Sequence, residues 1–226
     1  MSPDQKQEIL SRIKGLSPNT PQMRGIRRQT LKTKKIIMNN DLEKKSIYWV
    51  KNNIPFQVEK KYYCETRDIF QARLDAMVDF LLLNFKIIEN DIYILSAIAG
   101  EIGNNSFDHN LGKWPDIMGI FFSYELSEKK LTIILADRGQ GVFTTLKKVK
   151  PELKNDEEAL FVAFNEKISG RAPEPRGNGL KFVKENIKET KKHLLFMSGM
   201  AKIEINEKME ISQTEKINGC LAIINN

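Results

Sequence analysis

The chain has 226 residues, a net charge of +7 and 41% hydrophobic residues. Its length suits one domain with an extension, or two small domains, and its apolar residues suffice for a core. Its longest apolar runs, such as residues 80–83, are too short to span a bilayer. The N-terminus is polar from the start and has no apolar stretch of the signal-peptide type. Cys64 and Cys220 lack metal-like spacing, which favours two free thiols in a cytoplasmic protein.

The positive charge is concentrated in the first quarter of the chain. Residues 1–56 hold twelve Lys/Arg against four Asp/Glu, and the remaining 170 residues sum to −1. No acidic residue occurs between Glu8 and Asp41, where Arg24, Arg27, Arg28, Lys32, Lys34 and Lys35 gather. We expect residues 1–55 to form a basic, partly helical N-terminal extension. Such an arm is either simply solvated or meets nucleic acid, an anionic membrane surface or an acidic protein.

Hydrophobic periodicity predicts the remaining elements in chain order. A short helix or extended piece is expected over 41–52, then a strand over 57–63 and helices over 67–87 and 92–110. A hairpin of strands 117–126 and 131–136 is followed by helices over 142–149, 156–168 and 178–190. Strands follow over 194–198, 201–205, 208–212 and 220–224. This order predicts an α/β domain over 56–226, a two-layer sandwich with a mixed, mostly antiparallel sheet and helices on one face.

The helical segment AIAGEIGNNSFDHNLG carries Glu101 and Asn105 one turn apart. Residues four apart share a helix face, so a buried carboxylate and amide stacked there suit a ligand better than they suit packing. A second motif, Asp137-x-Gly139-x-Gly141, directly follows a predicted strand. Its glycines allow close backbone approach, and its aspartate can accept a hydrogen bond from an exocyclic amine. Alone, this second motif is typical of a tight turn.

A third motif, Arg176-Gly177-x-Gly179-Leu180, opens a predicted helix. Glycines and free N–H groups at a helix N-terminus suit a phosphate, although a glycine there is often only a cap. The motif is not a dinucleotide fingerprint, because no strand precedes it within a short βαβ unit. It is not a GxxxxGK phosphate loop either, because Leu180 separates the last glycine from the lysine.

Taken together and in this order, the three motifs resemble the histidine-kinase-like ATPase superfamily. That group includes gyrase, the large heat-shock chaperones, mismatch-repair ATPases, histidine kinases and anti-sigma-factor serine kinases. The resemblance covers about 57–226 and implies the Bergerat ATP-binding fold with bound ATP and Mg²⁺. It implies that Asn105 is the Mg²⁺ ligand and that Glu101 is the base that activates a water or a substrate hydroxyl. In the second box it implies that Asp137 meets the adenine amino group, beside Gly139, Gly141 and Val142.

The resemblance assigns phosphate binding to the third box, residues Gly177, Asn178, Gly179 and Leu180, and a lid over the nucleotide to about 142–176. Arg171 or Arg176 would reach the γ-phosphate, the alternative for each being a solvated loop arginine. EIGNNSFDHN, which includes Asp108, is similar to the ExxxNAxxH form of the anti-sigma-factor kinases. His109 would contact phosphate or hold the lid, or it is a structural cap.

Standalone anti-sigma-factor serine/threonine kinases are the most similar members. The acidic residue of ExxxN is intact, and neither His109 nor His193 lies on a phosphoacceptor hairpin. This implies γ-phosphate transfer to a hydroxyl of a regulatory partner, STAS-like or sigma-factor-like, and is compatible with a homodimer. The basic extension and the long lid with its PEP run depart from those kinases. An ATP-gated binding module or ATPase switch, whose arm engages nucleic acid or a regulator, therefore stays open. So does a site that is degenerate or takes another adenine nucleotide.

Overall fold

The computed structural model describes residues 41–52, 58–84, 89–127, 130–168 and 178–226. The chain divides into two units, Met1–Asn39 and Asn40–Asn226, and the described residues all belong to the second. The basic cluster and the helix expected near the N-terminus lie outside the described residues. The division differs from the boundary expected near residue 55, because the helix that begins at Asp41 packs within the second unit.

The described residues form six helices and seven strands. The helices are α3 (Asp41–Lys51), α4 (Arg67–Asn84), α5 (Glu89–Asn110), α6 (Gly141–Leu146), α7 (Asp156–Asn165) and α8 (Gly179–Glu189). The strands are β1 (Tyr63–Cys64), β2 (Ile120–Ser127), β3 (Lys130–Asp137), β4 (His193–Ser198), β5 (Ala201–Ile205), β6 (Met209–Gln213) and β7 (Cys220–Asn225). The described helices include none that is long and apolar enough to cross a membrane.

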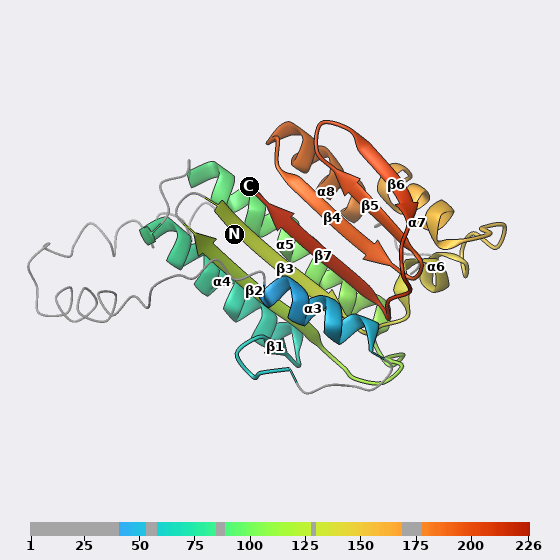
Figure 1. Ribbon diagram of the computed structural model, residues 1–226, viewed down its shortest axis with the longest axis horizontal. Helices are drawn as coiled ribbons and strands as arrows, with labels where there is room; N and C mark the ends of the chain where they lie inside the picture. The colour runs from blue at the N-terminus through green and yellow to red at the C-terminus, as the bar shows by residue number, and fades with distance from the viewer. Residues whose placement is uncertain (1–40, 53–57, 85–88, 128–129, 169–177) are drawn as a thin grey trace, which may run out of the picture. The chain divides into compact units, whose positions relative to one another are not determined.

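The strands form one sheet in the order β1-β2-β3-β7-β4-β5-β6, and every pair of neighbours is antiparallel (Figure 1). The α/β class is therefore confirmed, and the sheet, predicted to be mixed and mostly antiparallel, is antiparallel at every pair of its described strands. The last strand, β7, inserts between β3 and β4. Its register pairs Cys220 with Asp137 on one side and with Ser198 on the other. Three strand ends that are far apart in sequence thus form a single row at one end of the sheet.

One face of the sheet is covered by α4, α5, α7 and α8. Their apolar side chains join Phe122, Ile133 and Leu135 in the main core. Glycines in α5 allow close packing, because a Cβ built at Gly103 would overlap the ring of Phe70 on α4. This layer positions the C-terminal half of α5 beneath the row of strand ends.

The opposite face carries α3, which precedes the domain expected over 56–226, whereas α4, α5, α7 and α8 of that domain share one face as expected. Figure 1 shows α3 on the side of the sheet away from α5. Trp49 and Val50 of α3 pack on Phe121, Ile134 and Ile223. Successive side chains of a strand point to opposite faces, and β3 is buried at both alternating sets of positions along its second half. Such a strand needs cover on both sides, which α3 supplies.

The prediction of a strand over 57–63 is wrong, because β1 has only two residues. The chain turns before it: the amide of Tyr62 bonds the carbonyl of Glu59 at 2.8 Å. Arg73 of α4 then takes the carbonyls of Lys60 and Lys61, at 2.7 and 3.0 Å. With these backbone acceptors used by a turn and an arginine, a longer strand cannot form there. The other expected elements are confirmed in type, and their ends shift by a few residues.

Candidate functional site

A cavity of about 440 Å³ opens where the C-terminal half of α5 meets the end of β3 and the start of α8. Most of the predicted site residues line this one cavity: Glu101, Asn105, Asp108, His109, Asp137, Gly141, Val142, Gly179 and Leu180. They come from segments spread over some eighty positions of the sequence, and the antiparallel register together with α5 brings them together. Gly139 and Asn178 are not among the lining residues.

Glu101 and Asn105 face the first turn of α8. A Cβ built at Gly179 would overlap Oε1 of Glu101 and would lie 3.1 Å from Nδ2 of Asn105. Any side chain at Gly179 would therefore displace the carboxylate. The first N–H groups of a helix have no intrahelical acceptor, so α8 presents backbone donors next to a carboxylate and an amide. Asn178 precedes this turn as an exposed N-cap without a side-chain capping bond.

Asp137 ends β3 with its carboxylate buried on the α5 side, at 2% exposure. Its Oδ2 accepts from the hydroxyl of Ser106 at 2.7 Å, and its Oδ1 accepts from the amide of Gly139 at 2.8 Å. Burial raises the pKa of Asp137, and these two bonds together with one from the amide of Cys220 oppose the rise. A carboxylate offers about four acceptor positions. Asp137 therefore retains the capacity to accept from a donor that enters the cavity.

The loop after Asp137 is held by the end of α5. Asn110, only 4% exposed, donates to the carbonyl of Ser106 at 2.8 Å and accepts from the amide of Gln140 at 2.8 Å. A Cβ built at Gly139 would overlap the Asn110 side-chain amide. Gly139 thus serves close packing behind the cavity wall, whereas Gly141 lines the cavity itself.

Behind the loop, the ends of β4 and β7 supply a further set of contacts. Gly141 has φ of +76° and Gly219 has φ of +71°, both in the left-handed region that favours glycine. A Cβ at Gly219 would overlap the carbonyl oxygen of Asp137. The hydroxyl of Ser198 accepts from the amide of Val142 at 2.9 Å and donates to the carbonyl of Gly219 at 3.1 Å. The first turn of α6 is therefore fixed by a buried serine.

Several of these contributors are absent from the sequence prediction: Ser106, Asn110, Ser198, Gly219 and Cys220. Ser106 and Asn110 adjoin the first motif and lie four residues apart, so helical spacing alone could have placed them on one face. Ser198 and Gly219 carry no such signal, because only the strand register brings them to Asp137.

At the cavity mouth, Arg67 of α4 forms an ion pair with Asp108 of α5. The Arg67 side chain is about half exposed, whereas that of Asp108 is largely buried. The backbone carbonyl of His109 accepts from Nε2 of Gln140 at 2.9 Å. Asp108 and His109 therefore help to shape the wall. Arg67, which the motifs did not indicate, adds positive charge beside the first motif.

The described part of the predicted lid packs against the core. Leu160 and Phe164 of α7 belong to the main core, and Leu146 of α6 packs on Ala159 and Val162 in a smaller cluster. Arg171, Arg176 and Gly177 lie outside the described residues, so the third motif is placed only through its last three positions.

Comparison with known proteins does not identify a family: the chain matches no protein-family model and no curated protein. The superfamily resemblance therefore stays a prediction, and the geometry of the cavity is the basis on which a function can be proposed.

Proposed function

We propose that the domain has the Bergerat ATP-binding fold, that its cavity binds Mg·ATP, and that the protein transfers the γ-phosphate to a hydroxyl of a partner protein. One observation carries the proposal. A single cavity joins the buried, unsaturated carboxylate of Asp137 to the Glu101–Asn105 pair at the start of α8. A volume of about 440 Å³ lies within the usual range of small-molecule sites. Asp137 would accept from the adenine amino group, and the α8 amides would bind phosphate.

The donor set suits a metal that is delivered with its nucleotide. Among the described residues no group of three His, Cys, Asp or Glu side chains could hold a metal ion. Mg²⁺ is usually held by one or two protein oxygens together with substrate phosphates and water. The amide oxygen of Asn105 would be that protein ligand. When bound, Mg²⁺ would neutralise charge on the phosphates.

Glu101 lies against Gly179, at the end of the cavity where phosphate would bind, which suits the role of a base. Its carboxylate would accept the proton of a serine or threonine hydroxyl on the partner. The hydroxyl oxygen forms a bond to the γ-phosphorus as the bond to the β–γ bridging oxygen breaks, and ADP leaves. Arg67 at the mouth would stabilise phosphate charge from the α4 side. We expect the partner to be a regulatory protein of the STAS-like or sigma-factor-like kind.

The test is incubation of the full chain with γ-labelled ATP and Mg²⁺, alone and with proteins encoded beside it. We expect label to appear on a partner protein and to be lost in Glu101→Gln by about 10²–10⁴-fold, the usual contribution of a general base. Nucleotide binding should survive in Glu101→Gln. Glu185→Gln, which changes an exposed glutamate of α8, is the matched control. Label on the partner at an equal rate in Glu101→Gln would contradict the role of the base.

The charge distribution supports a second candidate, an ATP-gated binding module with slow hydrolysis at most. Residues 1–56 carry twelve basic against four acidic side chains. Under this alternative, Mg·ATP changes the affinity of the arm for nucleic acid or a regulator. Neutralising Arg27, Arg28, Lys32 and Lys34 to Gln would then weaken partner binding, make it less salt-dependent and leave nucleotide affinity unchanged. In the labelling assay, retained nucleotide or released phosphate without transfer favours this second function.

A further inference from the structure

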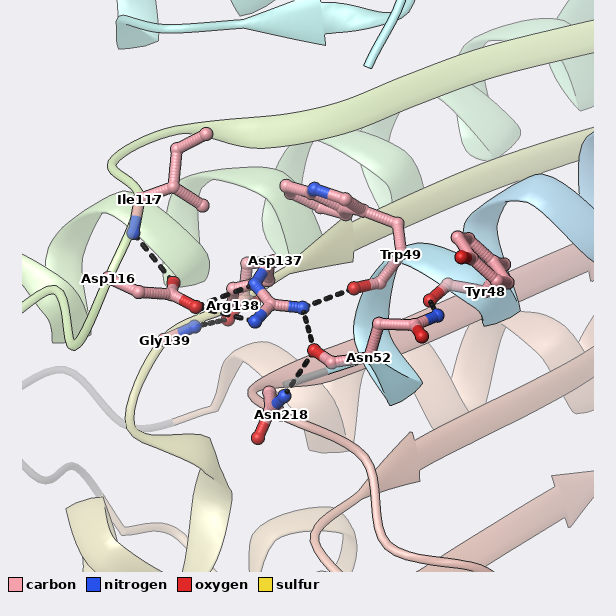
Figure 2. Close-up of polar contacts among 9 residues, drawn as sticks. All are labelled: Tyr48, Trp49, Asn52, Asp116, Ile117, Asp137, Arg138, Gly139 and Asn218. Carbon is pink, nitrogen blue, oxygen red and sulfur yellow. Dashed lines mark hydrogen bonds and ion pairs between the residues drawn. The ribbon is translucent and has the colours of Figure 1, made fainter. Parts of the chain in front are cut away.

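Arg138 follows Asp137 directly, and its side chain points to the side of the sheet that carries α3 (Figure 2). It is 1% exposed and is one of the largest fully buried side chains among the described residues. In the DxGxG motif this position is unconstrained, so the burial of a guanidinium group there needs its own explanation.

All three nitrogens of the guanidinium group donate within the protein. Nε and Nη2 bind Oδ2 of Asp116 at 2.8 and 2.5 Å. Nη1 donates to the carbonyl of Asn52 at 2.7 Å and also to that of Trp49. These two carbonyls close the C-terminal end of α3, where the helix dipole favours a cation. Arg138 therefore holds α3 against the end of β3, and we call this set of contacts the Arg138 clamp.

A second strand end adds to the hold on α3. The amide of Asn218 donates to the carbonyl of Val50 at 2.7 Å, and its side chain donates to the carbonyl of Asn52 at 3.2 Å (Figure 2). The next residue, Gly219, is the glycine that lies against the backbone of Asp137. Arg138 is thus the immediate neighbour of Asp137, which lines the cavity, and Asn218 is the neighbour of Gly219, which lies against the Asp137 backbone.

We propose that Arg138 is a positioning residue: by holding the end of α3, it fixes the backbone of the loop from Asp137 to Gly141 that forms the cavity wall. Asp137 and Gly139 flank Arg138, and the Gly139 amide bonds the Asp137 carboxylate at 2.8 Å. A displacement of the guanidinium group therefore moves both members of that bond. As far as ligand affinity is concerned, this inference rests on the proposed function. For the free protein it stands alone.

The alternative is that Arg138 merely pins α3 and contributes to global stability. The two roles differ in where amide exchange increases when the clamp is weakened. The loop amides of Gly139, Gln140 and Val142 are each held by a side-chain acceptor, from Asp137, Asn110 and Ser198 respectively. Their hydrogen exchange therefore reports the order of the loop without any ligand.

The test is hydrogen–deuterium exchange of the full chain and of Arg138→Met, read in peptides covering 41–52, 137–146 and, as a reference, 201–213. Arg73→Met is the matched control, because Arg73 also donates to two backbone carbonyls but lies away from the loop. In Arg138→Met we expect exchange in both α3 and the loop to rise at least tenfold more than exchange in the reference hairpin. In Arg73→Met neither segment should change.

Faster exchange in α3 with an unchanged loop would overturn the proposal, and so would an equal rise in all three peptides. If Arg138→Met does not fold, Arg138→Lys replaces it, because lysine keeps the positive charge but lacks the planar guanidinium group. The same two segments should then exchange faster, by a smaller factor. Adding Mg·ATP to the wild-type chain should slow exchange in α3 as well as in the loop, since coupling between sites is reciprocal. Slower exchange in the loop alone would contradict the proposal. Unchanged exchange in both segments would contradict ATP binding, and the role of Arg138 would then be decided by the exchange of Arg138→Met without ligand.

Discussion

Asp137 and Arg138 are consecutive, ionisable and almost fully buried, and their side chains bond on opposite sides of the sheet, Asp137 to α5 and Arg138 to the end of α3. On the α3 face, each nitrogen of Arg138 donates to a protein acceptor. On the α5 face, Asp137 adjoins an open cavity and keeps acceptor capacity after its bonds to Ser106 and Gly139. Burial of a charge therefore does not by itself mark a site. The buried charge whose nitrogens all bond to protein acceptors holds the fold, whereas the one that lines an open cavity can still accept from a ligand.

The largest effect on stability is expected for Arg138, on the α3 face of the sheet. Arg138→Met leaves Asp116 without its partner and removes the Arg138 donor from the carbonyls of Trp49 and Asn52, although Asn52 keeps its bond from Asn218. Breaking a buried pair typically costs 3–5 kcal/mol. Because the Asp116 side chain is 26% exposed, water can take over part of its charge, and we expect a loss of about 3 kcal/mol in the free energy of unfolding. Urea denaturation monitored by circular dichroism measures it. A loss as small as that of Arg73→Met would remove the distinction between the two faces.

On the α5 face, beside the cavity, Asp137→Asn should reduce ligand affinity without loss of stability. The amide oxygen can still accept from Gly139, and the Ser106 hydroxyl can rotate to accept from the new NH₂ group. Loss of a hydrogen bond to a charged group is worth about 1.5–3 kcal/mol, so we expect Mg·ATP to bind roughly 10–150-fold more weakly. The free energy of unfolding should equal or exceed that of the wild type. A variant that melts early and binds normally would reverse the assignment.

Gly219, which precedes β7 and contacts the backbone between the two faces, should show an intermediate effect. Gly219 has φ of +71° and lies against the Asp137 carbonyl. Gly219→Ala places a side chain in left-handed backbone, which costs about 1–2 kcal/mol, and it crowds the loop as well. We therefore expect lower stability and weaker nucleotide binding together, measured by thermal unfolding and titration. An effect on only one of the two properties would show that the faces are not joined there.

The pH dependence of stability separates the two charges further. Burial raises the folded-state pKa of Asp137 above its usual value of 3.8. A raised pKa means that the folded state disfavours the ionised carboxylate, so stability falls as pH rises from the unfolded pKa through the folded one. The stability advantage of Asp137→Asn should therefore be present at pH 7 and shrink toward pH 4. Urea denaturation of both proteins across this range checks it, and an advantage that grows on acidification would contradict it.

The smallest effect is expected at the exposed edge of α3. Lys51 and Glu215 form an ion pair at 2.6 Å, but the Glu215 side chain is 81% exposed. Solvent screens such pairs, and many contribute nothing measurable. Glu215→Gln should leave the melting temperature unchanged within error. A clear drop would mean that α3 depends on more than the Arg138 clamp and its apolar face.

The sequence predicts most of the elements, because each has an apolar face of regular period. It also predicts that Glu101 and Asn105 share one helix face, since helical spacing fixes that geometry. The contact of this face with Gly179 is known only from the structure. It does not predict the cover of the second face by α3. That cover depends on both alternating sets of β3 being buried, which one strand's pattern does not reveal.

Contacts that depend on strand register could not be predicted from the sequence either. Ser198 and Gly219 reach Asp137 only because β7 inserts between β3 and β4. Arg138 occupies a variable position of its motif, and its role depends on Asp116 and the end of α3, which no local pattern links to it.

Nucleotide binding at Asp137 is tested most directly by calorimetric titration of the full chain with Mg·ATP, beside Asp137→Asn and with Mg·GTP as the comparison ligand. We expect saturable binding of one ATP per chain, at least tenfold weaker binding in Asp137→Asn at an unchanged melting temperature, and weaker binding of GTP, which lacks the adenine amino group. No binding of ATP by the wild-type chain, or equal binding by the variant, would contradict the role of Asp137.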